Sequence, residues 1–129
     1  MRNAEFGMRN WGDGMENVIV TKSKNFAVRI IRAYKYLTAE KNEYIMSKQL
    51  LRSGTSIGAN VKEAVRGQTK PDFYAKLNIA LKEASEAEYW LEILYETDYT
   101  DKRLYDSINS DCEESIKLLV SITKTQQKE

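Results

Sequence analysis

Three carboxylates that lie close together, Glu83, Glu86 and Glu88, are the residues most suggestive of chemistry. At helical spacing Glu83 and Glu86 face the same side, and a carboxylate cluster without histidine would suit Mg²⁺ or Ca²⁺. Lys82 and basic residues elsewhere in the chain offer ordinary ion-pair partners, however. We therefore expect no metal and no cofactor, and assign the carboxylates to a buried polar network with Arg52; solvated charges are the alternative. The predicted network residues are Gln49, Asn60, Glu83 and Glu86.

We do not expect nucleophilic catalysis by the hydroxyl groups of Ser53, Thr55 and Ser56, because no general base accompanies them at a recognisable spacing. The chain contains no histidine. That removes Ser–His–Asp and Cys–His catalysis, the di-iron sites of ferritin-like bundles and most zinc sites. No glycine-rich phosphate-binding loop occurs either. We predict that the protein is not an enzyme, and no small-molecule substrate is evident.

Basic residues are the second chemical feature. Read as a helix, residues 47–66 place four of them on the side opposite the apolar face, and the preceding segment adds two more. Phosphate groups bind along such a surface. The candidate nucleic-acid-binding residues are Lys48, Arg52, Lys62, Arg66, Arg29 and Arg32. The net charge is only +1, so any such site is local, and a solvated surface balanced by nearby glutamates is the alternative.

Four segments with helical periodicity must position these residues, over about residues 23–37, 42–66, 69–97 and 101–126. Short connections make successive helices antiparallel neighbours. We predict an all-α, antiparallel up-down four-helix bundle as a single domain, residues 18–126. Residues 1–17 show no steady period and are predicted to form a flexible N-terminal tail.

Residues typical of helix ends mark these boundaries. Ser23 and Asn42 are the expected N-caps of the first two helices. Thr69-x-x-Asp72 resembles a capping box at the start of the third helix. Gly67 fits the left-handed position that follows the end of the second helix.

Gly54 and Gly58 lie one turn apart in the second helix, where each costs about 1 kcal/mol relative to alanine. We interpret both as helix-packing residues that let two backbones approach closely, opposite the three alanines in the middle of the third helix. The alternative is a loop at residues 54–56 between two short helices. The apolar face keeps its phase across the glycines, which favours one helix.

The third helix carries more apolar and aromatic surface than one bundle core needs. This surplus predicts a subunit interface, with scattered surface aromatics as the alternative. The candidate interface residues are Tyr74, Trp90, Ile93 and Tyr95.

Two stretches, QLLRSGTSIGANVKEA and FYAKLNIALKEASEAEYWLEIL, resemble a family of bacterial four-helix-bundle proteins. This family includes the intervening-sequence protein encoded within large-subunit ribosomal RNA genes, and the resemblance runs from about Glu16 to Lys124. It implies an antiparallel four-helix bundle, commonly a homopentamer, that binds nucleic acid. More distantly, the fold resembles the pentameric accessory protein of diversity-generating retroelements.

Two hypotheses of function follow. The first is a homo-oligomer, with a pentamer as first choice, that binds RNA or DNA phosphates non-specifically as an accessory factor. The second is a protein-protein interaction scaffold with no nucleic-acid role. The sequence has no apolar run long enough for a membrane helix and no signal-peptide core. Cys112 is its only cysteine, which favours a cytoplasmic location.

Overall fold

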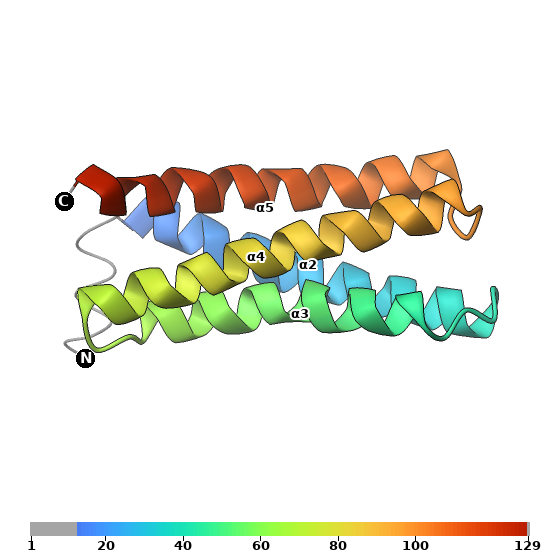
Figure 1. Cartoon of the computed structure of the whole chain (residues 1–129), viewed down its shortest axis with the longest axis horizontal. Coiled ribbons are helices and arrows are strands. Elements are labelled where there is room, and N and C mark those ends of the chain that lie inside the picture. Colours follow the sequence, from blue (N-terminus) through green and yellow to red (C-terminus); the bar gives the residue numbers. More distant parts are fainter. Residues whose placement is uncertain (1–12, 129) are drawn as a thin grey trace.

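Four helices make up the described part of the chain, which covers residues 13–128 in the computed structural model (Figure 1). They are α2 (Asp13–Ala39), α3 (Met46–Val65), α4 (Lys70–Glu96) and α5 (Lys102–Lys128). Each helix packs against the next one along the chain, α5 returns to α2, and no strand occurs among these residues. The predicted all-α, up-down four-helix bundle is confirmed.

Helix α2 begins earlier than its apolar pattern predicts. Residues 13–17, which the sequence analysis assigns to the tail, are therefore helical, and residues 1–12 lie outside the described residues. Ser23 is not an N-cap, because it lies inside the helix with 1% of its surface exposed and donates its hydroxyl to the Val20 carbonyl oxygen at 3.3 Å. It occupies a core position between Ile19 and Phe26. Because Ser23 is polar, it interrupts the apolar spacing of the buried stripe. The first turns of the helix are therefore not recognised from that spacing.

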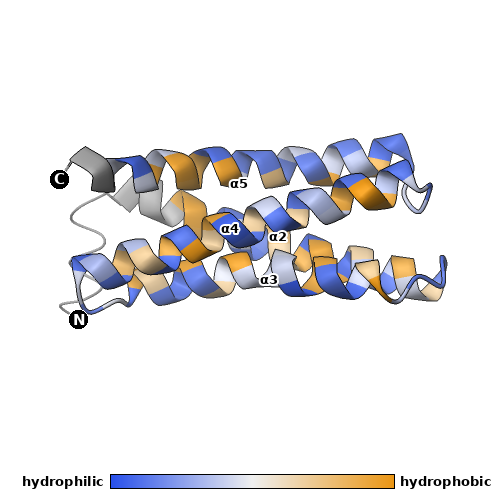
Figure 2. Ribbon diagram, in the orientation of Figure 1, coloured by the Kyte–Doolittle hydropathy of each residue, from blue (hydrophilic) through white to orange (hydrophobic). Residues whose placement is uncertain are grey.

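The apolar stripes form one core along the axis of the bundle, and apolar and polar residues alternate along each helix (Figure 2). In α4 the 4, 3 spacing from Phe73 to Leu94 predicts seven core residues, and all seven are buried. In α5 the apolar spacing predicts a buried stripe, which is buried except at the partly exposed Leu104; its residues are Leu104, Ile108, Cys112, Ser115, Leu119 and Ile122. Periodicity therefore identifies nearly the whole core.

Glu43, rather than Asn42, caps helix α3. Its carboxylate accepts backbone N–H bonds from Ile45 at 3.1 Å, Met46 at 3.0 Å and Ser47 at 2.6 Å. Burial by itself raises the pKa of Glu43, but these bonds outweigh it and hold the pKa below its ordinary value. Asn42 instead takes the left-handed conformation, with φ 55°, that turns the chain between the two helices.

The other helix ends follow the sequence more closely. Thr69 accepts the backbone N–H of Asp72 at 3.2 Å, and Asp101 accepts that of Leu104 at 2.8 Å. Gly67 does not adopt the predicted left-handed conformation. A side chain there would lie 3.0 Å from the Ala64 carbonyl oxygen, so close approach to the helix end explains this glycine.

The two helix-packing glycines face α2, and not the alanines of α4 as predicted. A Cβ atom on Gly54 would lie 2.8 Å from the Ile30 side chain, and one on Gly58 would lie 3.2 Å from the Ser23 carbonyl oxygen. At one of the alanines, the Cys112 thiol of α5 donates to the Ala84 carbonyl oxygen at 3.4 Å. The glycines therefore bring α3 close to α2. Helix α3 is continuous across Gly54, which excludes the loop alternative.

Candidate nucleic-acid interface

Arg52 is paired with two carboxylates of helix α4 and is therefore not an unpaired cation. Its guanidinium pairs with Glu83 at 3.2 Å and with Glu86, and its Nε donates to the Gln49 side chain at 3.5 Å. The hydrogen bond from Arg52, followed by that from the Trp90 indole at 3.1 Å, lowers the pKa of Glu86. The same hydrogen bond raises the pKa of Arg52.

This cluster holds three of the four residues predicted for the polar network. Asn60 lies outside it and donates its amide to the Ser56 carbonyl oxygen at 2.9 Å along its own helix. The network is also at the surface rather than buried, since the Arg52 side chain is 49% exposed and that of Glu86 is 36% exposed. It therefore joins α3 to α4 along the outside of the bundle.

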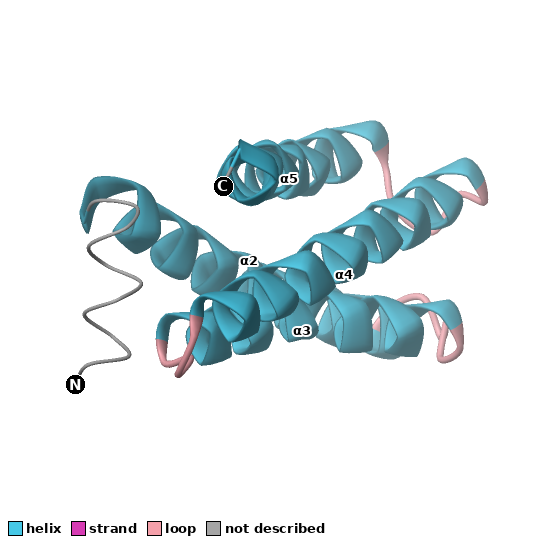
Figure 3. Ribbon diagram, turned by 60° about the vertical axis from the view of Figure 1, so that its left-hand side comes forward, coloured by secondary structure: helices cyan, strands magenta, loops and turns pink. Residues whose placement is uncertain are grey.

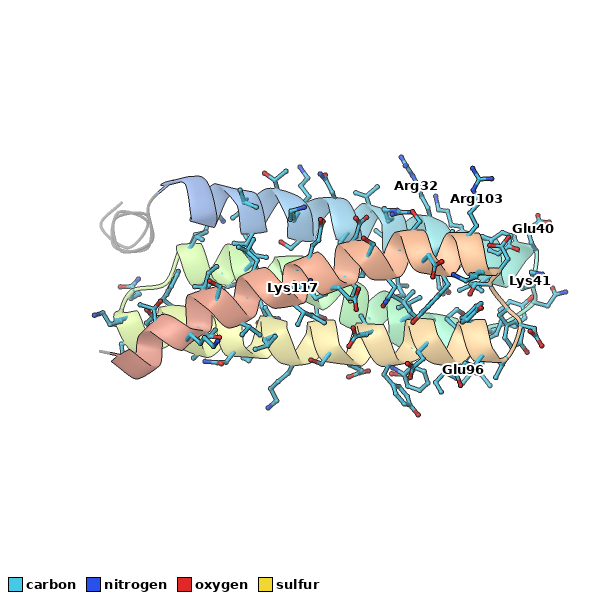
Figure 4. All side chains as sticks on the ribbon, turned by 90° about the horizontal axis from the view of Figure 1, so that it is seen from above. Arg32, Glu40, Lys41, Glu96, Arg103 and Lys117 are labelled. Atoms are coloured by element: carbon cyan, nitrogen blue, oxygen red, sulfur yellow. The ribbon has the colours of Figure 1, made fainter. Side chains whose placement is uncertain are left out.

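Arg29 is likewise held by a neighbouring helix. It donates to the Asp111 carboxylate at 2.7 Å, and to the carbonyl and hydroxyl oxygens of Ser107 at 3.2 and 2.9 Å. Arg32, about one turn further along α2, is exposed and has no acidic partner among the described residues. Figure 4 shows Arg32 pointing away from the bundle.

Lys48, Lys62 and Arg66 are exposed, and none of them forms an ion pair within the described chain. Lys48 and Lys62 are 14 residues apart, which at 1.5 Å per residue separates them by about 21 Å along α3. Lys62 and Arg66 are neighbours at the other end of the helix. Within the described chain, the six predicted cations therefore divide into two that are paired and four that are not, and Lys62 and Arg66 are the two unpaired ones that lie side by side.

A groove of about 660 Å³ runs beside Lys62 and Arg66, where α3 ends and α4 begins. Lys76 of α4 lines its other side, and this residue was not predicted from the sequence. The groove also contains two carboxylates, of which Glu63 is paired with Lys76 at 2.9 Å and Asp72 lies in the first turn of α4. The spacing of Lys76 after the Thr69 cap is the signal that could have placed it on this side of α4.

The predicted aromatic interface is only partly available. Tyr74 is 1% exposed and packs edge-to-face on Phe73 at 5.3 Å, so it belongs to the core of the chain and cannot form a subunit interface. Trp90 and Ile93 are half-buried. Tyr95 stacks on the Tyr105 ring at 4.6 Å.

Other large apolar side chains are more exposed than these. Tyr89 is 53% exposed on α4, and the loop between α2 and α3 presents Tyr44 at 58% and Ile45 at 78%. No periodicity marks the two loop residues, so the sequence analysis missed them.

The remaining reactive group is the Cys112 thiol. Burial, followed by the charges of Glu88, Glu113 and Asp111, raises its pKa to about 12, so it is protonated at neutral pH and is not a nucleophile. No group of three potential metal ligands comes together in the part of the chain that the structure describes. No described helix is long and apolar enough to cross a membrane.

The fold and the sequence both resemble known proteins. A crystal structure of a protein of unknown function from the S23 ribosomal protein family of Bacteroides thetaiotaomicron superposes with a TM-score of 0.84. The two are 57% identical, and the match covers 85% of this chain and 98% of that one. No functionally curated protein matches. The family model described as the 23S rRNA-intervening sequence protein matches residues 15–121, so the chain belongs to that family.

Proposed function

We propose that the protein is a non-catalytic, self-associating bundle that binds the phosphate backbone of RNA or DNA at the groove between α3 and α4. The observation that carries this proposal is the pair Lys62 and Arg66, which are adjacent, exposed and without acidic partners among the described residues. Lys76 extends the basic character across the groove. The lack of histidine and the protonated thiol of Cys112 support a binding role over catalysis.

The chemistry of the groove suits backbone contacts without base recognition. No aromatic ring lines it among the described residues, so that part of the chain offers no stacking platform of the kind on which single-stranded bases are usually held. Lysine and arginine contacts to phosphates position a nucleic acid without specifying its sequence. Each phosphate neutralised should make affinity fall by roughly one power of salt concentration.

Self-association would strengthen such a site. Among the described residues, one groove carries three cations against two carboxylates, so binding by a single copy should be weak. A ring of copies would repeat the groove. Once one groove has bound a nucleic acid, a second groove would meet the same molecule at a high effective concentration. A pentamer is our first choice for the number of copies, because this is what the family resemblance implies.

The test compares the parent with the double variant Lys62→Glu/Arg66→Glu, titrated with a structured RNA and with duplex DNA at two salt concentrations. The parent should bind both ligands at low salt, and the variant should lose binding to both by about tenfold or more. The matched control is Lys24→Glu/Lys117→Glu, which changes the net charge equally at two exposed lysines of other helices. If the groove variant and the control variant lost the same affinity, the loss would be explained by net charge alone. If the groove variant bound as well as the parent, the groove would not be the binding site.

A protein-protein interaction scaffold is the second candidate function. The loop residues Tyr44 and Ile45 favour it, because side chains this apolar and this exposed are costly unless a partner covers them. Absence of nucleic-acid binding by the parent at low salt would make this the better proposal.

A further inference from the structure

A second groove, of about 370 Å³, separates α2 from α5. Its floor is apolar and consists of Ala33, Leu104 and Ile108, while Arg29, Arg32 and Tyr36 line its sides. We call it the arginine groove. It forms because α2 crosses the bundle obliquely (Figure 3), which leaves the side chains of α2 and α5 apart where α2 ends and α5 begins.

Two arginines beside the arginine groove have no carboxylate partner in the described chain. Figure 4 shows that Arg32 of α2 and Arg103 of α5 point outward along the same edge of the bundle. Arg29 is held by Asp111, but neither Arg32 nor Arg103 has a carboxylate within ion-pair distance in the described chain. Within the described chain, two guanidinium groups without a carboxylate partner therefore flank the apolar floor: Arg32 in the groove lining, and Arg103 next to the lining residue Leu104.

The other flank of α5 has the opposite charge. A groove of about 380 Å³ between α4 and α5 is lined by Glu88, Glu92 and Glu113, together with Tyr89 and Tyr105. We call this surface the acidic face. None of its three carboxylates has a lysine or arginine partner among the described residues. Burial, then Glu113 and Glu92, raise the pKa of Glu88, as expected where negative charges gather without a cation.

The arginine groove and the acidic face lie at the same level of the bundle but look in different directions. Both use the first half of α5, with Leu104 and Ile108 turned to one side and Tyr105 and Glu113 to the other. Glu96 follows Glu92 by about one turn of α4 and extends the acidic face. In Figure 4 it points to the edge opposite the two arginines. One chain thus carries two complementary surfaces that cannot meet each other.

We propose that these two surfaces are the halves of one contact between copies of this chain. The arginine groove of one copy receives the acidic face of the next, with Tyr89 packing on the apolar floor. Arg32 and Arg103 then face the carboxylates at Glu92 and Glu96. The proposal rests on the self-association in the proposed function and names its surfaces.

A second copy fits the arginine groove better than another partner does, because each surface supplies what the other lacks. The groove has free cations and an open apolar floor, and the acidic face has free carboxylates and a tyrosine that is 53% exposed. Such a contact joins different patches on successive subunits, so it is heterologous and generates a ring when the rotation between copies closes. Opposite charges also fix the register of the contact and discourage like surfaces from meeting.

Charge reversal tests the pairing on the full chain. Arg32→Glu/Arg103→Glu makes the groove acidic, and Glu92→Arg/Glu96→Arg makes the acidic face basic. Light scattering should find each variant alone at the monomer mass of 14.9 kDa, at concentrations where the parent is a multiple of it. Mixing the two variants should restore association, because each altered surface then meets a complementary one. Circular dichroism should show that both variants remain helical.

The controls and remaining outcomes separate this inference from the proposed function. Lys24→Glu/Lys117→Glu should keep the parent mass, and so should Ile45→Ser in the exposed loop. Variants that keep the parent mass, or that stay monomeric after mixing, would overturn the pairing while leaving self-association intact. A monomeric parent would overturn both the pairing and self-association. If Arg32→Glu/Arg103→Glu lost RNA binding at unchanged mass, the arginine groove would hold nucleic acid and the pairing would also fall.

Discussion

Helix α2 makes two very different contacts, one with α3 and one with α5. Toward α3 it is in close contact, with the Gly54 backbone against the Ile30 side chain and the Gly58 backbone against the main chain at Ser23. Toward α5 it is joined by two surface ion pairs, Lys22 with Glu114 at 2.8 Å and Arg29 with Asp111 at 2.7 Å. Hollows lie beside these pairs, including the arginine groove.

This difference indicates where stability and binding reside. Close packing of buried side chains tolerates little change in volume. Ion pairs whose side chains are 34–53% exposed contribute little, because water already solvates both charges. The α2–α3 contact should therefore dominate the free energy of unfolding. The α2–α5 side is left free to carry a binding surface.

The largest expected effect comes from filling the α2–α3 contact. Gly54→Leu places its Cβ 2.8 Å from the branched and fully buried side chain of Ile30, so one of the two helices must shift. We expect a loss of about 1–3 kcal/mol in the free energy of unfolding, measured by denaturant titration. Ala59→Leu is the control, because Ala59 is exposed on the same helix and should change stability by less than about 0.5 kcal/mol. Equal stability of the two variants would contradict the glycine contact.

A smaller effect is expected on the α2–α5 side. A double-mutant cycle with Arg29→Ala and Asp111→Ala should give a coupling energy below about 1 kcal/mol, because both side chains are partly solvated. The coupling should shrink further in high salt. A value near that expected for Gly54→Leu would show that the two sides of α2 are equally important for stability.

The sequence predicts the helices and the core well because both follow from the spacing of apolar residues within one helix. It misplaces features that depend on a neighbouring helix. Ser23 is a core residue whose backbone lies against Gly58 of α3, and Tyr74 is buried although it lies outside the 4, 3 stripe of α4.

The state of each cation is also a tertiary property. Arg52 is paired with residues more than 30 positions away, and the partner of Arg29 is 82 positions away. Charge periodicity along one helix places such arginines on the correct side of that helix. It cannot tell which of them remain free for a ligand.

The smallest effect, and the one that links stability to assembly, concerns Glu88. Burial and the charges of Glu113 and Glu92 raise its pKa above the ordinary value of 4.5. A carboxyl with a raised pKa binds its proton more tightly in the folded state than in the unfolded one. Its protonation therefore favours folding below the ordinary pKa, and this advantage disappears as the pH rises through the folded-state pKa. At neutral pH the charged Glu88 is mildly destabilising.

Glu88→Gln should therefore stabilise the isolated chain at pH 7, by less than about 1 kcal/mol, and should give no gain near pH 3. The monomeric Arg32→Glu/Arg103→Glu background is suitable for this measurement, using denaturant titration at both pH values. In the self-associated parent, arginines of the next copy should stabilise the charged carboxylate, so the same substitution should bring no gain or a small loss at pH 7. An equal gain in both backgrounds would mean that no cation reaches the acidic face in the assembly.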